Sequence, residues 1–211
     1  DRNVDSMQQA LQSGLIDDYS LDIVGVVSDA DLIIISVPIL AVAEVLEQIK
    51  SVIGEKTILT DVGSVKGNIS KDVSKVLGDN FDRFVLGHPI AGSERSGVSA
   101  ADENLFKRHK VILTPEQRTC ERALDLVTDA WELTGAVVEL MSVKHHDEVL
   151  AATSHLPHLL AYSLVDTLAN NHENKDIFNY AAGGFRDFTR IASSSPIMWR
   201  DIFVGNKDEV L

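Results

Sequence analysis

The sequence predicts an α/β protein: a Rossmann-like, doubly wound sheet followed by a smaller all-α domain. Up to residue 141, short β-branched runs alternate with longer segments whose apolar residues recur every three to four positions. This alternation is typical of βαβ units around a parallel sheet. Beyond residue 141 no period of two remains, and only the helical spacing continues. We therefore expect two domains, over residues 1–141 and 142–211.

Composition excludes several classes of protein. The 211 residues include 32 acidic and 19 basic side chains, a net charge of −13, which argues against a nucleic-acid partner. Apolar runs such as residues 32–35 are far shorter than the roughly 20 residues of a membrane helix, and no signal peptide is recognisable. Cys120 is the single cysteine, so neither an internal disulfide nor a cysteine-based zinc site is expected. These features favour a cytoplasmic protein with no membrane partner.

The chain is expected to begin with a helix and then a central strand. Val4, Met7 and Leu11 share one helical face, and Gly14 is placed to end that helix in a left-handed conformation. Residues 31–38 (DLIIISVP) are too continuously apolar for a half-solvated strand. They are therefore expected at the centre of a sheet that is covered on both faces.

The same alternation predicts the other elements of the first domain. Helical stripes alternate with β-branched runs, and one of the strands leads directly into His88. The expected elements are a helix over 42–53, a strand over 57–61, a helix over 69–77, strands over 84–87 and 109–114, a helix over 116–133 and a strand over 136–140.

The second domain is predicted to begin with a long helix over residues 149–168. Pro157 lies inside it and should kink it, because the proline ring clashes with the carbonyl four residues earlier. His155 and His158 are three residues apart, about 60° around a helix, so only one is expected to face a cleft between the domains. Since no compact further ligands accompany them, we expect no metal site.

Four polar segments are candidates for chemistry, and two of them follow predicted strands. Ligands of open α/β sheets bind beyond the carboxyl ends of the strands, which is where these two segments lie. His88, between Gly87 and Pro89, sits on a stiff loop there; it is either a functional residue or a structural histidine. The four segments are residues 61–67 (DVGSVKG), 87–97 (GHPIAGSERSG), 154–158 (SHLPH) and 183–190 (GGFRDFTR).

Three further residues have two possible roles each. Arg190 could form a local anion site in this acidic chain, or a surface salt bridge with Asp187. Ser64 could bond a ligand or simply cap a helix. Asp1, ahead of the first helix, could be the acidic residue that binds the adenine ribose in a dinucleotide-binding fold, or a charged terminus without a task.

In their order and spacing these segments resemble the prephenate dehydrogenase family, which includes arogenate and cyclohexadienyl dehydrogenases. The resemblance implies a nicotinamide-binding domain, a helical dimerisation domain that forms a homodimer, and an active site between the two. It also implies that the first strand and glycine-rich turn are missing before Asp1, as is a helical tail after Leu211. The matching segments are residues 36–38 (SVP), 61–67, 87–92 (GHPIAG), 154–158, 188–190 (FTR) and 196–201 (PIMWRD).

The implied reaction is the NAD-dependent oxidative decarboxylation of prephenate or arogenate, a small dianionic substrate, in tyrosine biosynthesis. The resemblance places the general base on His88, its hydrogen-bonding partner on Ser64, and substrate binding on His158 and Arg190. Because protonated His88 could not accept a proton, acid should slow the reaction in the ordinary histidine range. Arg2 leaves NADP possible beside NAD. The implied cofactor contacts are Asp1, Ser36, Val37, Pro38, Ser64 and Glu94.

Two other functions stay open from the sequence. One is a regulatory protein that keeps the two-domain body and binds a metabolite without turning it over. The other is a dehydrogenase of small hydroxy acids, which would be expected to use a lysine base in the helical domain, where Lys144 is available.

Overall fold

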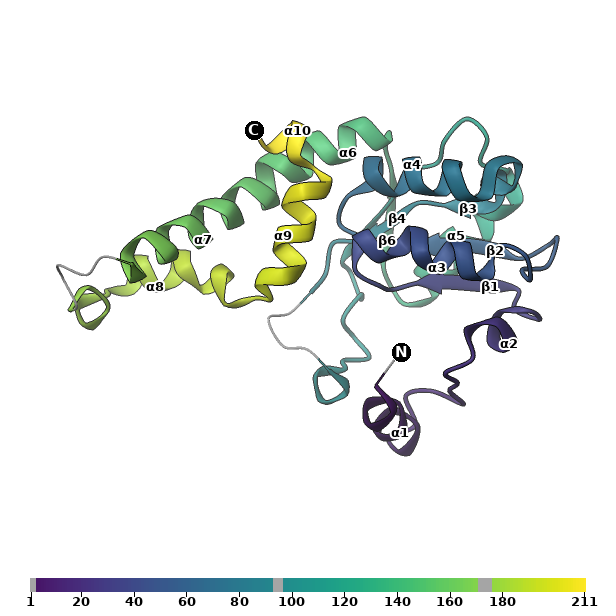
Figure 1. The fold of residues 1–211 in the computed structure, drawn as a ribbon, viewed down its shortest axis with the longest axis horizontal. Helices are drawn as coiled ribbons and strands as arrows, with labels where there is room; N and C mark the ends of the chain where they lie inside the picture. Colours follow the sequence, from purple (N-terminus) through teal and green to yellow (C-terminus); the bar gives the residue numbers. More distant parts are fainter. Residues whose placement is uncertain (1–2, 93–96, 171–175) are drawn as a thin grey trace.

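The computed structural model describes residues 3–92, 97–170 and 176–211. Asp1 and Glu94, two of the expected cofactor contacts, lie outside the described residues. Figure 1 shows a body of strands covered by helices and, to its left, a helical part that projects away from it.

The strands form two three-stranded sheets. In the first sheet β1, β2 and β3 are parallel, with Leu32 paired to Ile58 and Leu59 to Phe84. In the second sheet β4 is antiparallel to β5, and β5 is parallel to β6. The strands are β1 (Leu32–Ile35), β2 (Ile58–Asp61), β3 (Phe84–Val85), β4 (Gly87–Pro89), β5 (Lys110–Leu113) and β6 (Val137–Leu140).

Helices cover both faces of the first sheet. On one face α3 (Val42–Ile49) and α4 (Lys66–Leu77) bury Leu46 and Ile69 against Leu59. Ile58, which precedes Leu59 on β2, packs in a separate cluster with Val127 of α5 (Glu121–Leu133). Neighbouring residues of one strand thus enter cores on opposite faces, which confirms the predicted doubly wound arrangement.

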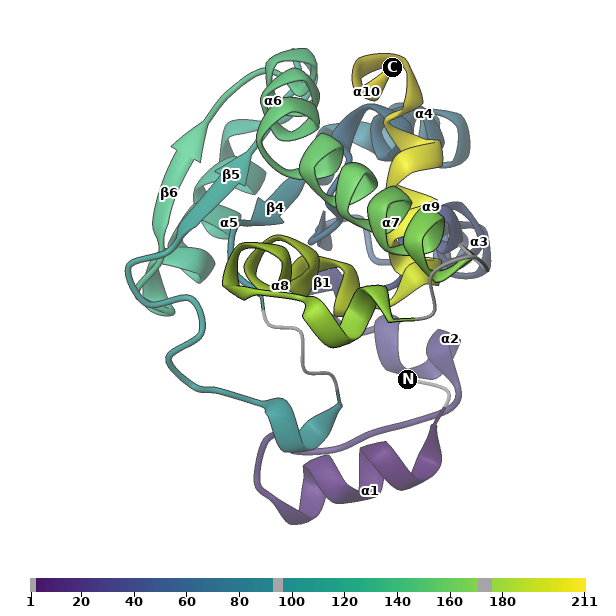
Figure 2. The ribbon, with the colours of Figure 1, turned by 90° about the vertical axis from the view of Figure 1, so that its left-hand side faces the viewer.

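Smaller elements flank this body. The first helix, α1, ends as predicted, with Gly14 at a φ of +68°, and lies away from the sheets in both ribbon views (Figures 1 and 2). The flanking elements are α1 (Val4–Gln12), α2 (Ile23–Val27) and the 3₁₀ turns η1 (Ile39–Ala41), η2 (Gly78–Arg83) and η3 (Val98–Ala100).

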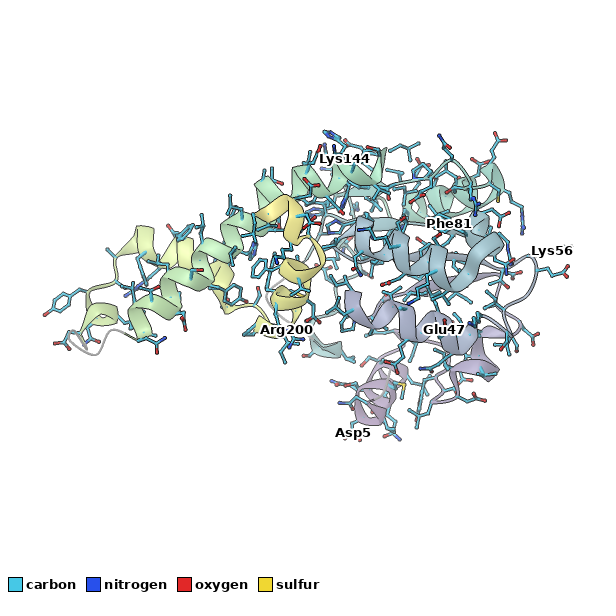
Figure 3. The ribbon with its side chains drawn as sticks, turned by 45° about the horizontal axis from the view of Figure 1, so that its top comes forward. Asp5, Glu47, Lys56, Phe81, Lys144 and Arg200 are labelled. Atoms are coloured by element: carbon cyan, nitrogen blue, oxygen red, sulfur yellow. The ribbon has the colours of Figure 1, made fainter. Side chains whose placement is uncertain are left out.

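After β6, the described chain forms helices and no strand. In Figures 1 and 3, α7 and α8 form the projecting arm, and α9 stands between this arm and the sheet body. There α9 packs on η1, and a Cβ on Gly205 would approach Ile39 Cδ1 to 2.8 Å. The elements are α6 (Val143–Leu150), η4 (Ala151–His155), α7 (Leu156–Ala169), η5 (Ile177–Tyr180), α8 (Gly183–Thr189), η6 (Arg190–Ser193), α9 (Pro196–Gly205) and α10 (Lys207–Val210).

The expected disturbance at Pro157 takes the form of a π-helical segment. Residues 151–155 form this wider turn, and Pro157 lies in the first turn of α7 that follows it. A wider turn accommodates a residue that lacks an N–H and crowds the preceding carbonyl. The α-helical ladder is therefore interrupted just before the proline, and the helix continues beyond it.

Several element boundaries differ from the sequence prediction, and two of these differences change how the chain runs in the sheet body. The strand expected over 84–87 divides at Leu86, and β4 runs antiparallel to its neighbour β5. The helix expected from residue 116 begins at Glu121, because residues 115–120 form a turn in which the Glu116 amide donates to Thr119 Oγ1. Within the described ranges, no helix is long and apolar enough to cross a membrane.

Candidate active site

A cavity of about 910 Å³ lies where the two parts of the molecule meet. The sheet body contributes Ser36 and Ser64, just beyond the carboxyl ends of β1 and β2, together with His88 on β4. The helical part contributes His155 and His158. Most of the remaining lining is apolar, which is the usual character of a small-molecule site with a few orienting polar groups. The lining also includes Ile34, Thr60, Val62, Ile90, Trp131, Leu150, Ile191, Met198, Trp199 and Ile202.

His88 is the central polar group of this cavity. Its side chain is almost fully buried, and its Nδ1 lies 2.8 Å from Nε2 of His146. Burial lowers the pKa of His88 well below its ordinary 6.5, and the nearby charge of Lys66 and the imidazoles of His146 and His155 lower it further. The imidazole is therefore neutral at pH 7 and available as a proton acceptor.

Behind His88, α6 supplies a buried histidine and a carboxylate. Nδ1 of His146 lies 2.7 Å from Oδ1 of Asp147. The same carboxylate accepts hydrogen bonds from the backbone amides of Lys66 (2.9 Å) and Gly67 (2.7 Å) in the first turn of α4. Burial would raise the pKa of Asp147, but the donors outweigh it and the pKa is lowered. Asp147 is thus an ionised acceptor that ties α6 to α4.

A second buried pair supports the strand that carries His88. Lys66 Nζ donates to Asp61 Oδ2 and to the carbonyl of Gly87 (2.5 Å), and both charged side chains are fully inaccessible. Asp61 also accepts from the amides of Gly63 (2.7 Å) and Gly87 (3.1 Å). Desolvation lowers the pKa of Lys66, while the charge of Asp61 opposes that shift. These bonds link the end of β2 directly to the residue before His88.

On the opposite side of the cavity, His158 stacks on Trp199 of α9, with ring centroids 3.6 Å apart. Its Nδ1 donates to the carbonyl of Ser154 (2.8 Å). Desolvation lowers the pKa of His158, the hydrogen bond to Ser154 opposes this, and the charge of Arg190 adds to the lowering. Arg190 is exposed and is not among the residues that line the cavity, although the next residue, Ile191, is.

Both histidines of the 154–158 segment line the cavity, so the expectation that only one would face it is wrong. Both rings lie beside Trp199 of α9, so side chains about 60° apart around the helix can face the same cavity. The amide of Asn206 donates to Nδ1 of His155 (3.0 Å), and burial lowers the pKa of His155 to about 4.

The structure brings Ser36, Ser64, His88 and His158 to one cavity; Arg190 does not line it, but its charge lowers the pKa of His158. Val37 and Pro38 follow Ser36 but are not among the residues that line it. Sequence reasoning missed the buried polar residues behind His88. His146 and Asp147 were not among the candidates, because no local pattern connects them with a histidine 58 positions away. Asp61 and Lys66 lie in the candidate segment 61–67, but the sequence assigned them no role.

The lysine required by the hydroxy-acid alternative does not reach this cavity. Lys144 lies at the surface of α6 (Figure 3), with a side chain 79% exposed, and its Nζ is 3.5 Å from Glu148. The structure therefore gives no support to a lysine base at this position.

Two family models together match almost the whole chain. Residues 1–140 match the nucleotide-binding domain of prephenate dehydrogenase, and residues 142–211 match its dimerization domain. The cyclohexadienyl dehydrogenase of Zymomonas mobilis is 40% identical over 200 residues, which cover 92% of this chain and 67% of that protein. The prephenate dehydrogenase of Bacillus subtilis is 42% identical over 207 residues, covering 96% of this chain and 55% of the relative. The chain thus spans between about half and two thirds of these relatives.

Solved structures agree with the sequence relatives. Prephenate dehydrogenase from A. aeolicus, in complex with hydroxyphenyl propionate and NAD+, superposes with a TM-score of 0.92 at 45% identity, covering 100% of this chain and 73% of that one. Arogenate dehydrogenase from Synechocystis gives a TM-score of 0.80 at 28% identity, covering 99% and 74%. These matches extend over both parts of the fold and over the cavity between them. The chain belongs to the prephenate dehydrogenase family.

Proposed function

We propose that the protein catalyses the NAD-dependent oxidative decarboxylation of prephenate or arogenate, a step in tyrosine biosynthesis. The observation that carries this proposal is the placement of a neutral, buried histidine, His88, across one cavity from a second histidine beside an arginine. The first is suited to accept a proton, and the pair His158 and Arg190 is suited to bind a carboxylate. Family membership supports the same reaction.

The chemistry requires one base at a defined position. The ring carbon of the substrate that bears the hydroxyl loses a hydride, and the hydroxyl proton passes to a ring nitrogen of His88 as the carbonyl forms. Since Nδ1 faces His146, Nε2 is the nitrogen left for this proton. The ring carboxylate then leaves as carbon dioxide, and the electrons of the broken carbon–carbon bond restore aromaticity. A positioned base typically contributes about 10²–10⁴ in rate.

Substrate orientation is assigned to groups on both sides of the cavity. Ser64 would bond the reacting hydroxyl and keep it in line with His88, so its loss would be felt as misorientation. Arg190 would bind a carboxylate of the dianion through charge-assisted hydrogen bonds, with His158 beside it. Both prephenate and arogenate, which differ in a side-chain keto or amino group, are proposed as substrates.

The cavity fits a nicotinamide cofactor at the sheet edge. Ser36 and Ser64 lie beyond the carboxyl ends of two adjacent parallel strands, which is the usual position of a dinucleotide in this fold, and the neighbouring lining is apolar. NAD, when bound there, accepts the hydride. Asp1, Val37, Pro38 and Glu94 are proposed as further contacts on the basis of the family resemblance.

We also propose that the protein is a homodimer through its helical part. The second family model is a dimerization domain. Large apolar side chains remain exposed on the helices of this part, which a second copy would cover. They include Leu156, Leu160, Phe178, Phe188, Ile197 and Met198.

Replacing His88 tests the proposed reaction. The full-length protein with His88→Asn should bind substrate and lose kcat by about 10²–10⁴, because the proton acceptor is removed. Reduced cofactor is followed by its absorbance with prephenate and arogenate in separate assays, and far-UV circular dichroism verifies folding. Near-normal turnover of the folded variant at saturating substrate would refute the assignment. Binding of either substrate to the wild-type protein without turnover would favour the regulatory alternative.

A further inference from the structure

Three side chains form a continuous hydrogen-bonded series that begins at the cavity. His88 Nδ1 lies 2.8 Å from His146 Nε2, and His146 Nδ1 lies 2.7 Å from Asp147 Oδ1. The two rings meet edge to face, with centroids 5.1 Å apart. His146 is fully buried, so water does not compete for either of its nitrogens. The series crosses from β4 in the sheet body to α6 in the helical part.

The far end of this series is anchored by backbone groups. Asp147 accepts from the amides of Lys66 and Gly67, and its own carbonyl accepts from the buried side chain of Asn206 (3.0 Å). A Cβ on Gly67 would lie 2.8 Å from Asp147 Oδ2, so the carboxylate sits against the backbone of α4. Asp147 is therefore fixed in position and ionised, and it can only accept hydrogen bonds.

Only one arrangement of protons is possible when both imidazoles of the series are neutral and Asp147 is ionised. His146 then donates from Nδ1 to Asp147, and its Nε2 keeps a lone pair. His88 must then donate from Nδ1 to that lone pair. The proton of neutral His88 thus lies on Nδ1, and Nε2 keeps the lone pair that a general base needs. An imidazole in water prefers the opposite tautomer, so the preference at His88 has to come from its neighbours.

We propose that His146 and Asp147 are positioning residues that hold the proton of His88 on Nδ1 and leave Nε2 free to accept the substrate proton. This inference rests on the proposed function for its catalytic meaning, because a tautomer matters to turnover only if His88 acts as the base. The tautomer itself is a property of the protein and can be measured without substrate.

Long-range ¹H–¹⁵N spectra of ¹⁵N-histidine-labelled full-length protein at pH 7.5 measure the tautomer directly. The His88 resonances are assigned with His88→Asn. The expected spectrum has a protonated Nδ1 and an unprotonated Nε2 for His88, and the same tautomer for His146. A His88 ring protonated on Nε2 would overturn the proposal, whatever the kinetics show.

Variants at position 146 separate positioning from packing. His146→Leu removes the acceptor and should lower kcat by about 10- to 100-fold with KM changed less than roughly twofold, and His88 should shift toward the Nε2-protonated tautomer. His146→Gln offers a side-chain oxygen in place of Nε2 and should restore kcat to within roughly fivefold of the wild type. The exposed neighbour provides the matched control, His145→Leu, which should change neither rate nor tautomer.

The outcomes distinguish this proposal from the function on which it rests. Suppose that His88 carries its proton on Nδ1 and loses that preference in His146→Leu, but that neither prephenate nor arogenate is turned over. The tautomer proposal is then supported and the proposed reaction is refuted. If the substrate is turned over but folded His146→Leu keeps normal kcat and an unchanged tautomer, the positioning role is refuted. Loss of activity in His146→Gln equal to that in His146→Leu would also contradict it. If His146→Leu does not fold, the wild-type spectrum and the kinetics of His146→Gln still test the positioning role.

Discussion

At the scale of single residues, the site depends on two opposite electrostatic environments. His88 is buried beside the positive charge of Lys66 and two imidazoles, so it stays neutral. Arg190, by contrast, is exposed and permanently charged, and its charge reaches His158. A neutral proton acceptor in the cavity and a fixed cation whose charge reaches the cavity residue His158 would suit the proposed substrate, which gives up a proton at one end and carries a carboxylate at the other.

The pH dependence follows from the burial of His88. Its neutral form is the active one, so kcat/KM should be constant above pH 6.5 and fall only as the pH drops through the lowered pKa. The sequence alone suggested a fall in the ordinary histidine range; burial, Lys66, His146 and His155 move the expected fall to more acid pH. A kcat/KM profile from pH 4.5 to 8.5 measures it. A midpoint at or above 6.5 that disappears in His88→Asn would contradict this prediction.

For Arg190→Gln we expect KM for the substrate to rise about 10- to 100-fold with a smaller change in kcat, because a charge-assisted hydrogen bond contributes roughly 1.5–3 kcal/mol. Steady-state kinetics at saturating cofactor gives both constants. Arg122→Gln, on the distant face of α5, is the matched control and should leave KM unchanged. An unchanged KM in Arg190→Gln would remove this residue from the substrate site.

At the scale of elements, the connection from β2 to α4 organises the site. Asp61 ends the strand, Ser64 reaches the cavity, and Lys66 and Gly67 begin the helix. Through Lys66 this segment bonds the carbonyl of Gly87, one residue before the base, and through its amides it bonds Asp147 on α6. Residues 61–67 thus connect β2 and β4 to α6, the first helix of the second part.

Removing the buried charge of Lys66 should therefore lower the stability of the fold. Lys66→Met leaves the carboxylate of Asp61 buried without its charged partner, and the expected loss in the free energy of unfolding is about 3–5 kcal/mol. Lys50→Met breaks an exposed pair with Glu47, at 2.6 Å, and should change stability by less than about 0.5 kcal/mol. Urea denaturation of both variants measures the difference. Equal stabilities would show that the Lys66–Asp61 pair is dispensable.

The sequence predicted these elements better than their connections. Apolar periodicity located the strands and both helical layers, because burial on one or two faces imposes a period along the chain. It did not show the split at Leu86, because residues 84–86 form one continuous apolar run. Nor did it pair His88 with His146 or Lys66 with Gly87, because such contacts depend on how distant segments meet in three dimensions. His88 itself was identifiable from its glycine and proline neighbours at a strand end.

At the scale of the whole molecule, the cavity exists only where the sheet body and the helical part meet. The proposed base comes from β4, its buried partners from α6, and the proposed carboxylate site from α7 and the turn after α8. Neither the sheet body nor the helical part alone contains all of these residues. The arm of α7 and α8 extends away from this junction (Figure 1) and carries exposed apolar side chains, which is consistent with a second copy covering it.

A charge on that arm should weaken the proposed dimer. Leu160 of α7 is 52% exposed, and Leu160→Lys should shift the protein toward a monomer because lysine cannot be buried without a partner. Leu133, at the end of α5, is 88% exposed in the other part, and Leu133→Lys is the control that should keep the wild-type mass. Sedimentation equilibrium gives the mass of each. A wild-type monomer at micromolar concentration would rule the homodimer out.

The most direct test of a shared cavity is a crystal structure of the full-length protein with NAD and a hydroxyphenyl carboxylate analogue. We predict the analogue's hydroxyl oxygen within about 3 Å of His88 Nε2, and its carboxylate at His158 and Arg190. An analogue bound with its hydroxyl remote from His88, or with its carboxylate away from both of the other residues, would contradict the proposal that these groups act on one substrate.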